Sequence, residues 1–411
     1  MALAIAIGLD IGVGGGLISP AADATAQSMA PESIATRYIL DSGMLVLGGI
    51  TALILTIAFA FRDAGLSRDS SAIEPALRLS GILAAGGIMF WATGYHLIFS
   101  VEPGGLLGEF APYRANDADP ISTGYASAAH WLYYFGLATI STAIVSSAIA
   151  ERTRLAVFVI FAGAFIGLIF PIALSWVYAG GFLISEWRFH DAGTASVHII
   201  GGAAALAAVI IIGPRDGGAT AFHNTSSALP VAAFSTAIML MSLFVVTAAA
   251  QPASSIDAAI NISNAVVNQL LAACAGAAFA LFLTRLVYKR TGLIFSLAGA
   301  VGGAVALSAD PIQPASWQAL MIGAMSGVIV TVLSPFLRRF QIDDAGVVIA
   351  AHFFCGIWGV LIAPWHSPEV SFLGQAMGAA MLTSFAFFMS LCLWTALRFS
   401  IGVRVTKPPK G

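Results

Sequence analysis

Two histidines in matching apolar surroundings are the residues of this chain best suited to chemistry. His198 stands in the run Val-His-Ile-Ile-Gly-Gly, and His352 stands in Ala-His-Phe-Phe-Cys-Gly about 150 residues later. An imidazole can donate or accept a hydrogen bond and can pass on a proton near neutral pH. Because an ionisable side chain is costly inside a membrane, the matched pair predicts a functional site where two related halves bring both rings near the bilayer midplane.

The elements that must position these histidines are long apolar segments. Hydrophobic residues make up 59% of the chain and charged residues only 9%, far below the roughly 25% charged content of a soluble domain. Most segments reach the ~20 residues that cross the hydrocarbon layer. We therefore predict an all-α membrane protein with eleven transmembrane helices, at residues 38–61, 79–101, 124–150, 155–179, 195–213, 229–250, 257–287, 292–308, 316–337, 345–364 and 371–396.

The two histidine contexts divide the predicted transmembrane domain, residues 38–400, into two inverted five-helix repeats and a final helix. The halves cover about 38–213 and 229–364, and the last helix covers 371–396. Residues 1–37 are an N-terminal extension, of which 1–27 fit a signal sequence except that Asp10 interrupts the apolar part and no basic residue precedes it. The sequence leaves open whether residues 1–27 are cleaved off. Residues 401–411 are expected to form a short cytoplasmic tail.

Basic residues predict the orientation of the chain in the membrane. With the N-terminus outside, three basic residues, Arg37, Arg114 and Arg188, lie outside. The other fifteen then lie on the cytoplasmic side: Arg62, Arg68, Arg78, Arg152, Arg154, Arg215, Arg285, Lys289, Arg290, Arg338, Arg339, Arg398, Arg404, Lys407 and Lys410. This bias predicts an N-out, C-in topology with an odd number of spans. We expect the protein in the inner (plasma) membrane.

Other residue patterns limit the chemistry. The three cysteines, Cys274, Cys355 and Cys392, lie in apolar segments without the spacing of metal ligands. We expect no metal site, no cofactor and no nucleic-acid partner. Runs of small residues, such as Gly299-Ala-Val-Gly-Gly303, predict close packing between transmembrane helices. Asp343 and Asp344 are expected to cap the tenth span.

Several blocks in order along the chain resemble the ammonium transporter (Amt/Rh) family. They are ATISTAIVSSAIAER at 138–152, VYAGGFL at 177–183, AGTASVH at 192–198, DDAGVVIAAH at 343–352 and CGIWG at 355–359. The resemblance implies a homotrimer, with one narrow pore in each subunit between the two halves. It also implies that ammonium is captured at an outer vestibule, loses a proton near an aspartate, and crosses an apolar pore past paired histidines. The protein is then not an enzyme.

The family's pore residues fall on positions that partly match. His198 and His352 fall on the twin-histidine positions. The two phenylalanines that gate the family's pore fall on Leu137 and Val246, which keep an apolar plug of smaller bulk. The predicted pore therefore retains its proton relay and changes its gate.

The family's ammonium recruitment site is altered more strongly. Its tryptophan falls on Tyr178, its serine on Ala250, and another vestibule aromatic on Tyr133. The aspartate position holds His190, with Asp191 one residue later. Asp191 therefore has two readings: the deprotonating carboxylate, shifted by one residue, or the N-cap of the following helix.

Three functions fit these residues. The first is transport of ammonium or ammonia through the twin-histidine pore. The second is a non-conducting ammonium receptor on the same fold, which signals to a cytoplasmic partner. The third is a related pore for another small solute. A P-II-type regulatory partner on the cytoplasmic side fits the first reading, and the sequence leaves the choice open.

Overall fold

The fold is built from helices that run through the whole described part of the chain. A computed structural model describes residues 31–67, 73–119, 123–215, 228–253 and 256–405. The predicted signal segment at 1–27 and the basic residues Lys407 and Lys410 lie outside these ranges. Among the described residues, β-structure amounts to one isolated bridge between Thr153 and Arg404.

The first half contains five long helical segments, two of which include a π-helical turn. Their parts are α2 (Pro31–Leu66), α3 (Ile73–Met89) with η1 (Phe90–Gly94) and α4 (Tyr95–Phe99), α6 (Ser127–Ala148), α7 (Leu155–Ala164) with η2 (Phe165–Ile169) and α8 (Phe170–Ser175), and α10 (Ala195–Ile212). A short helix, α9 (Phe182–Trp187), precedes α10. These segments overlap the first five predicted spans.

The second half and the last segment are also helical. They comprise α11 (Leu229–Ala249), α12 (Ile256–Tyr288), α13 (Leu293–Leu307), α14 (Ser316–Arg339), η3 (Ala345–Val347), η4 (Ala350–Phe354), α15 (Cys355–Ile362), η5 (Ala363–Trp365) and α16 (Phe372–Ser400). Within the described residues, nine helical segments are long and apolar enough to cross a membrane, and α13 is a shorter apolar helix. α6 is long enough but rich in Ser, Thr and Tyr. An all-α, multi-pass membrane protein is confirmed, and the count of eleven crossings stays a prediction.

Small residues bring α12, α13 and α14 into close contact. A Cβ atom on Gly303 of α13 would lie 2.2 Å from the Ala272 carbonyl oxygen of α12, and one on Gly323 of α14 would lie 2.1 Å from the same atom. A Cβ on Gly299 would lie 2.4 Å from the Gly276 carbonyl oxygen. Any larger residue would force these helices apart, as expected for small-residue interfaces in membranes.

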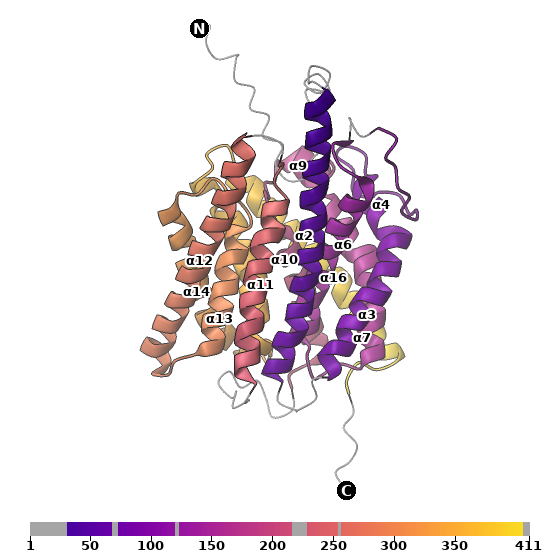
Figure 1. The fold of residues 1–411 in the computed structure, drawn as a ribbon. Helices are drawn as coiled ribbons and strands as arrows, with labels where there is room; N and C mark the ends of the chain where they lie inside the picture. Colours follow the sequence, from indigo (N-terminus) through magenta and orange to yellow (C-terminus); the bar gives the residue numbers. More distant parts are fainter. Residues whose placement is uncertain (1–30, 68–72, 120–122, 216–227, 254–255, 406–411) are drawn as a thin grey trace.

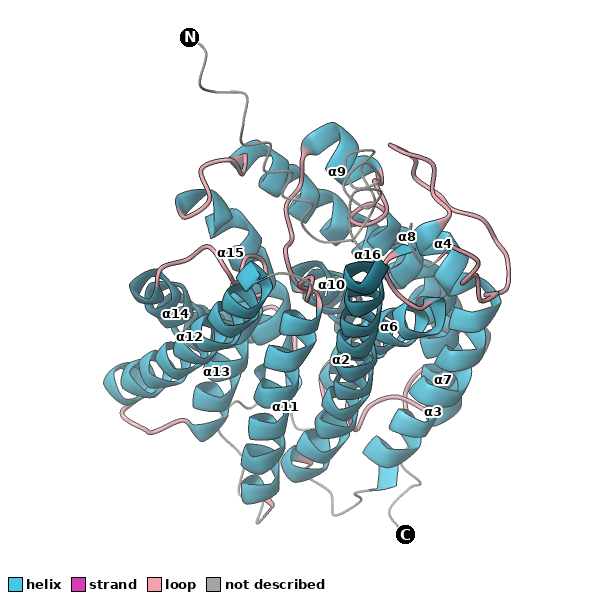
Figure 2. Ribbon diagram, turned by 45° about the horizontal axis from the view of Figure 1, so that its top comes forward, coloured by secondary structure: helices cyan, strands magenta, loops and turns pink. Residues whose placement is uncertain are grey.

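The two histidine-bearing segments lie in the interior, between the two halves. α10 packs against α6 of the first half and against η4, α15 and α16. η4 packs in turn against α13 and α14. Figures 1 and 2 show α10 behind α2 and α11, which lie side by side at the front of the bundle. This arrangement buries both histidine segments away from the lipid-facing surface.

Candidate functional site

The two predicted pore histidines meet at the centre of the bundle. The Nδ1 atoms of His198 on α10 and His352 on η4 are 3.2 Å apart, and their ring centroids are 5.0 Å apart. Both side chains are almost fully buried, with 1% and 3% exposure. A hydrogen bond between two Nδ1 atoms requires one to donate and the other to accept. The pair thus holds one proton between the two Nδ1 atoms, one on each half.

Small residues make this approach possible. A Cβ on Gly202 would lie 2.4 Å from the Cβ of Phe353, and one on Gly201 would lie 2.6 Å from the Ser141 carbonyl oxygen. The Ser141 hydroxyl donates to the Val197 carbonyl oxygen at 3.0 Å, which ties α6 to α10 one residue before His198. The glycine pair after His198, singled out in the sequence, therefore serves the close contact of α10 with both α6 and η4.

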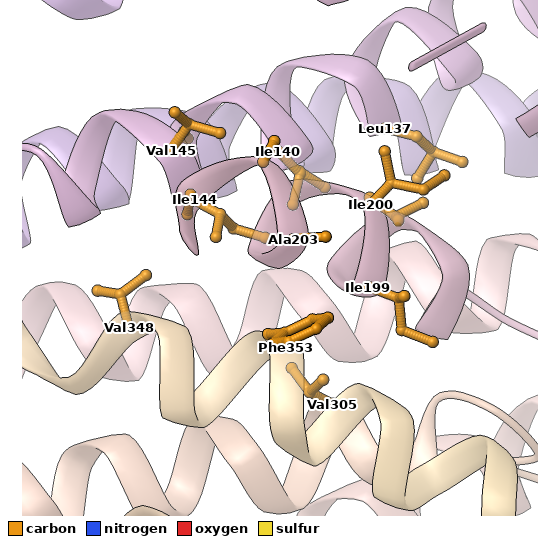
Figure 3. Close-up of a cluster of buried hydrophobic side chains, with 14 of the residues drawn as sticks. Leu137, Ile140, Ile144, Val145, Ile199, Ile200, Ala203, Val305, Val348 and Phe353 are labelled. Carbon is orange, nitrogen blue, oxygen red and sulfur yellow. The ribbon is translucent and has the colours of Figure 1, made fainter. Parts of the chain in front are cut away.

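Apolar side chains next to both histidines in the chain belong to one buried cluster, which we call the apolar shell. Figure 3 shows side chains of α6 and α10 facing Val305, Val348 and Phe353 of the second half. The Phe59 ring of α2 lies 5.4 Å from the His352 ring. Among the described residues the Nε2 atom of His198 has no hydrogen-bond partner. A buried polar atom in apolar surroundings can be satisfied by a small ligand that hydrogen-bonds.

The predicted gate residues are fully enclosed. Leu137 on α6 and Val246 on α11 have no exposed surface. The Tyr133 hydroxyl, one turn before Leu137, donates to the Val246 carbonyl oxygen at 2.9 Å. This bond joins α6 to α11 at the level of the predicted gate.

The predicted recruitment tyrosines are buried and connected by a third ring. Tyr178 and Tyr133 are 3% and 2% exposed. Each lies edge-on to Tyr134 with 5.3 Å between ring centroids. The Tyr178 hydroxyl donates to the Gly193 carbonyl oxygen at 3.1 Å, and burial raises the pKa of this phenol well above its ordinary value, so it stays protonated. Sequence reasoning missed Tyr134, although it stands beside Tyr133 in an aromatic run.

Asp191 makes the contacts of a helix cap. Its carboxylate accepts from the backbone N–H groups of Ser196 at 2.6 Å, Ala195 at 3.2 Å and Gly193 at 3.3 Å. Burial raises its pKa, and these bonds oppose the rise. The capping interpretation is confirmed, and the deprotonating role stays a prediction, since one carboxylate can do both. The side chain of His190, at the family's aspartate position, turns instead to Asp310.

The second histidine segment has a matching cap at its start. The Asp344 carboxylate accepts from the backbone N–H groups of Ile349 at 2.8 Å and Ala350 at 3.1 Å, so the predicted cap of the tenth span is confirmed for Asp344. Burial raises the pKa of Asp344 to about 6. Asp343 has a different role, because its carboxylate forms a two-pronged ion pair with Arg215 at 2.8 and 2.9 Å.

A family model agrees with this geometry. The model of the Ammonium Transporter Family matches residues 43–409. The chain belongs to this family. Among its family relatives is a putative ammonium transporter, sll1017, of Synechocystis, 28% identical over 91% of this chain and 88% of that protein. Another is the ammonium transporter Amt2 of Archaeoglobus fulgidus, 27% identical over 89% and 84%.

Two solved structures have a similar fold. A structure titled Sensor Amt Protein has a TM-score of 0.79 and 23% identity and covers 89% of this chain and 95% of its own. The crystal structure of Candida albicans Mep2 has a TM-score of 0.81 and 18% identity, with 91% and 88% covered. Sequence identity this low supports a shared fold and leaves function to the site.

Proposed function

We propose that this chain conducts ammonium or ammonia across the membrane through a pore centred on His198 and His352. The observation that carries the proposal is the buried 3.2 Å Nδ1–Nδ1 contact between the two halves of a member of the ammonium transporter family. We include in the proposal eleven spans, an N-out orientation, two inverted five-helix repeats, a homotrimer and a location in the inner (plasma) membrane.

Contacts at the two ends of the bundle support the alternating topology. At the C-terminal end of α10, Arg215 pairs with Asp343 before η3 and with Glu151 after α6. At the opposite end of α10, His190 lies near Asp310 after α13. The predicted third and fifth crossings thus end where the tenth begins. Arg152, also predicted to be cytoplasmic, lies 3.7 Å from the Asp343 carboxylate at this end.

The apolar shell favours passage of the neutral species. A bare cation pays heavily for leaving water, whereas ammonia needs only a few hydrogen bonds. The unpartnered Nε2 of His198 can offer one, and the shared proton between the Nδ1 atoms lets the pair rearrange donors and acceptors. An ammonium ion that leaves its proton at the mouth can thus cross as ammonia.

Recruitment is assigned to Tyr178, Tyr133 and Asp191. Two ring faces and a carboxylate attract a small cation by cation–π and charge interactions. Their burial means that the ion must lose much of its water to reach them, which selects against larger hydrated cations. Leu137 and Val246 form the next barrier, as an enclosed apolar plug.

A non-conducting receptor is the second candidate, because the predicted gate is fully enclosed and Tyr133 fastens α6 to α11 beside it. Ammonium would then bind at the tyrosines, and helix movement would signal to a cytoplasmic partner. In the transport reading, a P-II-type protein is the corresponding regulatory partner.

The decisive experiment is ammonium flux into proteoliposomes that contain the purified full chain. We expect an ammonium-dependent pH change or current in the wild type, and its loss in His198→Ala and His352→Ala. The matched control is His96→Ala, which changes a histidine outside the pair. No flux in the wild type, together with saturable ammonium binding, would replace transport by the receptor function.

A further inference from the structure

A second group of titratable side chains lies at the upper end of the bundle, away from the histidine pair. Asp310, in the link between α13 and α14, is buried. Its Oδ2 atom lies 3.4 Å from Nδ1 of His366 and 3.5 Å from Nε2 of His190. The Ser367 hydroxyl donates to the same oxygen at 2.5 Å. We call His190, Asp310 and His366 the outer triad.

The outer triad joins three separate parts of the chain. His190 precedes α10, Asp310 follows α13, and His366 follows α15. Gln375 of α16 holds the His190 backbone on both sides, since its Oε1 accepts from the His190 N–H at 2.7 Å and its Nε2 donates to the His190 carbonyl oxygen at 2.8 Å. His190 is therefore fixed through its backbone. Its ring lies within ion-pair distance of Asp310, although its Nε2 atom has no hydrogen-bond partner among the described residues.

The segment fixed in this way is the one that presents Asp191. The N–H groups of Ala192 and Thr194 donate to the carbonyl oxygens of Ala309 at 2.8 Å and Ser308 at 3.1 Å. Residues 190–194 thus lie along residues 308–310, beside Asp310. Any change in the attraction between His190 and Asp310 acts on the residue next to Asp191.

We propose that the outer triad is a positioning device for Asp191, which makes ammonium recognition at the outer mouth depend on external pH. Its members act through Asp191 rather than on the ion itself. The inference rests on the proposed function for the role of Asp191 in ammonium recognition. Its structural half, the pH-dependent fixing of residues 190–194 by the outer triad, does not depend on transport.

The direction of the pH response follows from the groups around the triad. Asp310, Asp191 and Glu369 face His190, and Asp310 and Ser367 face His366. Burial opposes protonation of His190, but the contact with Asp310 outweighs it and raises the pKa above 6.5. Burial raises the pKa of Asp310, but the nearby His190 and His366 rings and the bond from the Ser367 hydroxyl outweigh it and keep this pKa below 3.8.

The sign of the stabilisation is then set by His190. A raised histidine pKa stabilises the folded contact fully below about pH 6.5, and this stabilisation is lost as the pH rises through the folded value. Asp310 stays ionised throughout this range, because its lowered pKa keeps its contribution in place above about pH 4. The outer triad is thus tightest at mildly acidic external pH and loosens in alkaline medium.

Hydrogen–deuterium exchange of the full chain in nanodiscs tests the structural half. After correction for the intrinsic pH dependence of exchange, peptides covering residues 188–196 should exchange faster at pH 8 than at pH 6, by up to about tenfold per unit of pKa shift. His190→Gln and Asp310→Asn should remove this pH difference, whereas His96→Gln should keep it. An unchanged pH difference in both triad variants would overturn the proposal.

Ammonium flux in proteoliposomes tests the functional half. The flux of the wild type should change with external pH between 6 and 8, and His190→Gln should flatten that profile while retaining flux. If the wild type conducts and His190→Gln keeps the full profile, the positioning role is wrong and transport stands. A third outcome is that no protein conducts, while hydrogen exchange differs between pH 6 and pH 8 in the wild type but not in His190→Gln. In that case the proposed function fails, and the pH-dependent fixing of residues 190–194 stands.

Discussion

The two histidine segments both begin with an aspartate that caps the helix, but the two aspartates have different neighbours. Asp191 caps α10 and Asp344 caps η4 and the helix after it, each through backbone N–H groups two and three residues before a histidine of the buried pair. Asp344 lies near the Arg62 guanidinium, which lowers its pKa against burial. Asp191 instead has tyrosine rings as neighbours. The same kind of cap therefore lies in the field of an arginine in one segment and among tyrosines in the other.

The histidines themselves should show the least difference between the two segments. His198→Ala and His352→Ala each remove one side of the 3.2 Å contact, so both should lower ammonium flux by about 10²-fold or more, the usual contribution of a positioned proton-transfer group. Flux can be followed by stopped-flow fluorescence in proteoliposomes. A large loss in only one variant would break the equivalence of the two halves.

The two caps should separate stability from recognition. Asp191→Asn and Asp344→Asn each replace a charged capping carboxylate by a neutral amide. The lost attraction to the helix dipole typically costs ~0.3–1 kcal/mol, so both should lower the thermal midpoint in detergent. Ammonium affinity, measured by calorimetric titration, should fall in Asp191→Asn and stay unchanged in Asp344→Asn. Equal affinity in all three proteins would reduce Asp191 to a cap.

Substitutions of Tyr178 test ammonium recognition beside Asp191 and should change the affinity by a smaller factor. Replacing its ring by leucine removes a cation–π contact worth ~1 kcal/mol, so ammonium affinity should fall about fivefold in Tyr178→Leu. Tyr178→Trp should keep or increase it. Tyr125→Leu serves as the aromatic control, because the Tyr125 ring stacks on His130 and is not part of the proposed recruitment site. Identical titrations for the wild type and both Tyr178 variants would place recognition elsewhere.

The gate should give the smallest change, and only in selectivity. Leu137 and Val246 leave less bulk than two phenylalanines, so the wild type should admit methylammonium in appreciable proportion to ammonium. The double variant Leu137→Phe/Val246→Phe should reduce the methylammonium-to-ammonium flux ratio by a few-fold. A ratio that does not change would show that the size barrier lies at another level of the pore.

Sequence periodicity and composition were sufficient for the helices but not for every side chain at the site. Apolar length predicted the long helical segments, whereas the short helix α9 lies outside every predicted span. The matching contexts of His198 and His352 predicted that the two side chains meet, because each context can be read from a short stretch of sequence. The outer triad was invisible, since His190, Asp310 and His366 lie far apart in the chain and share no motif. The burial of Tyr178 was also missed, because it depends on Tyr134 and on the fold of a loop.

The loop that leads into the second histidine segment has a consequence for how the chain tolerates changes in length. His198 follows its cap Asp191 by seven residues, whereas His352 follows Asp344 by eight. In both segments the capped N–H groups lie three and two residues before the histidine. The additional residue therefore lies between Asp344 and Ile349, where Gly346 has a positive φ of 65°. Deletion of one residue from this loop can be taken up by the loop itself. A deletion between a capped N–H group and its histidine has no such reserve and would turn the imidazole by ~100° about the helix axis.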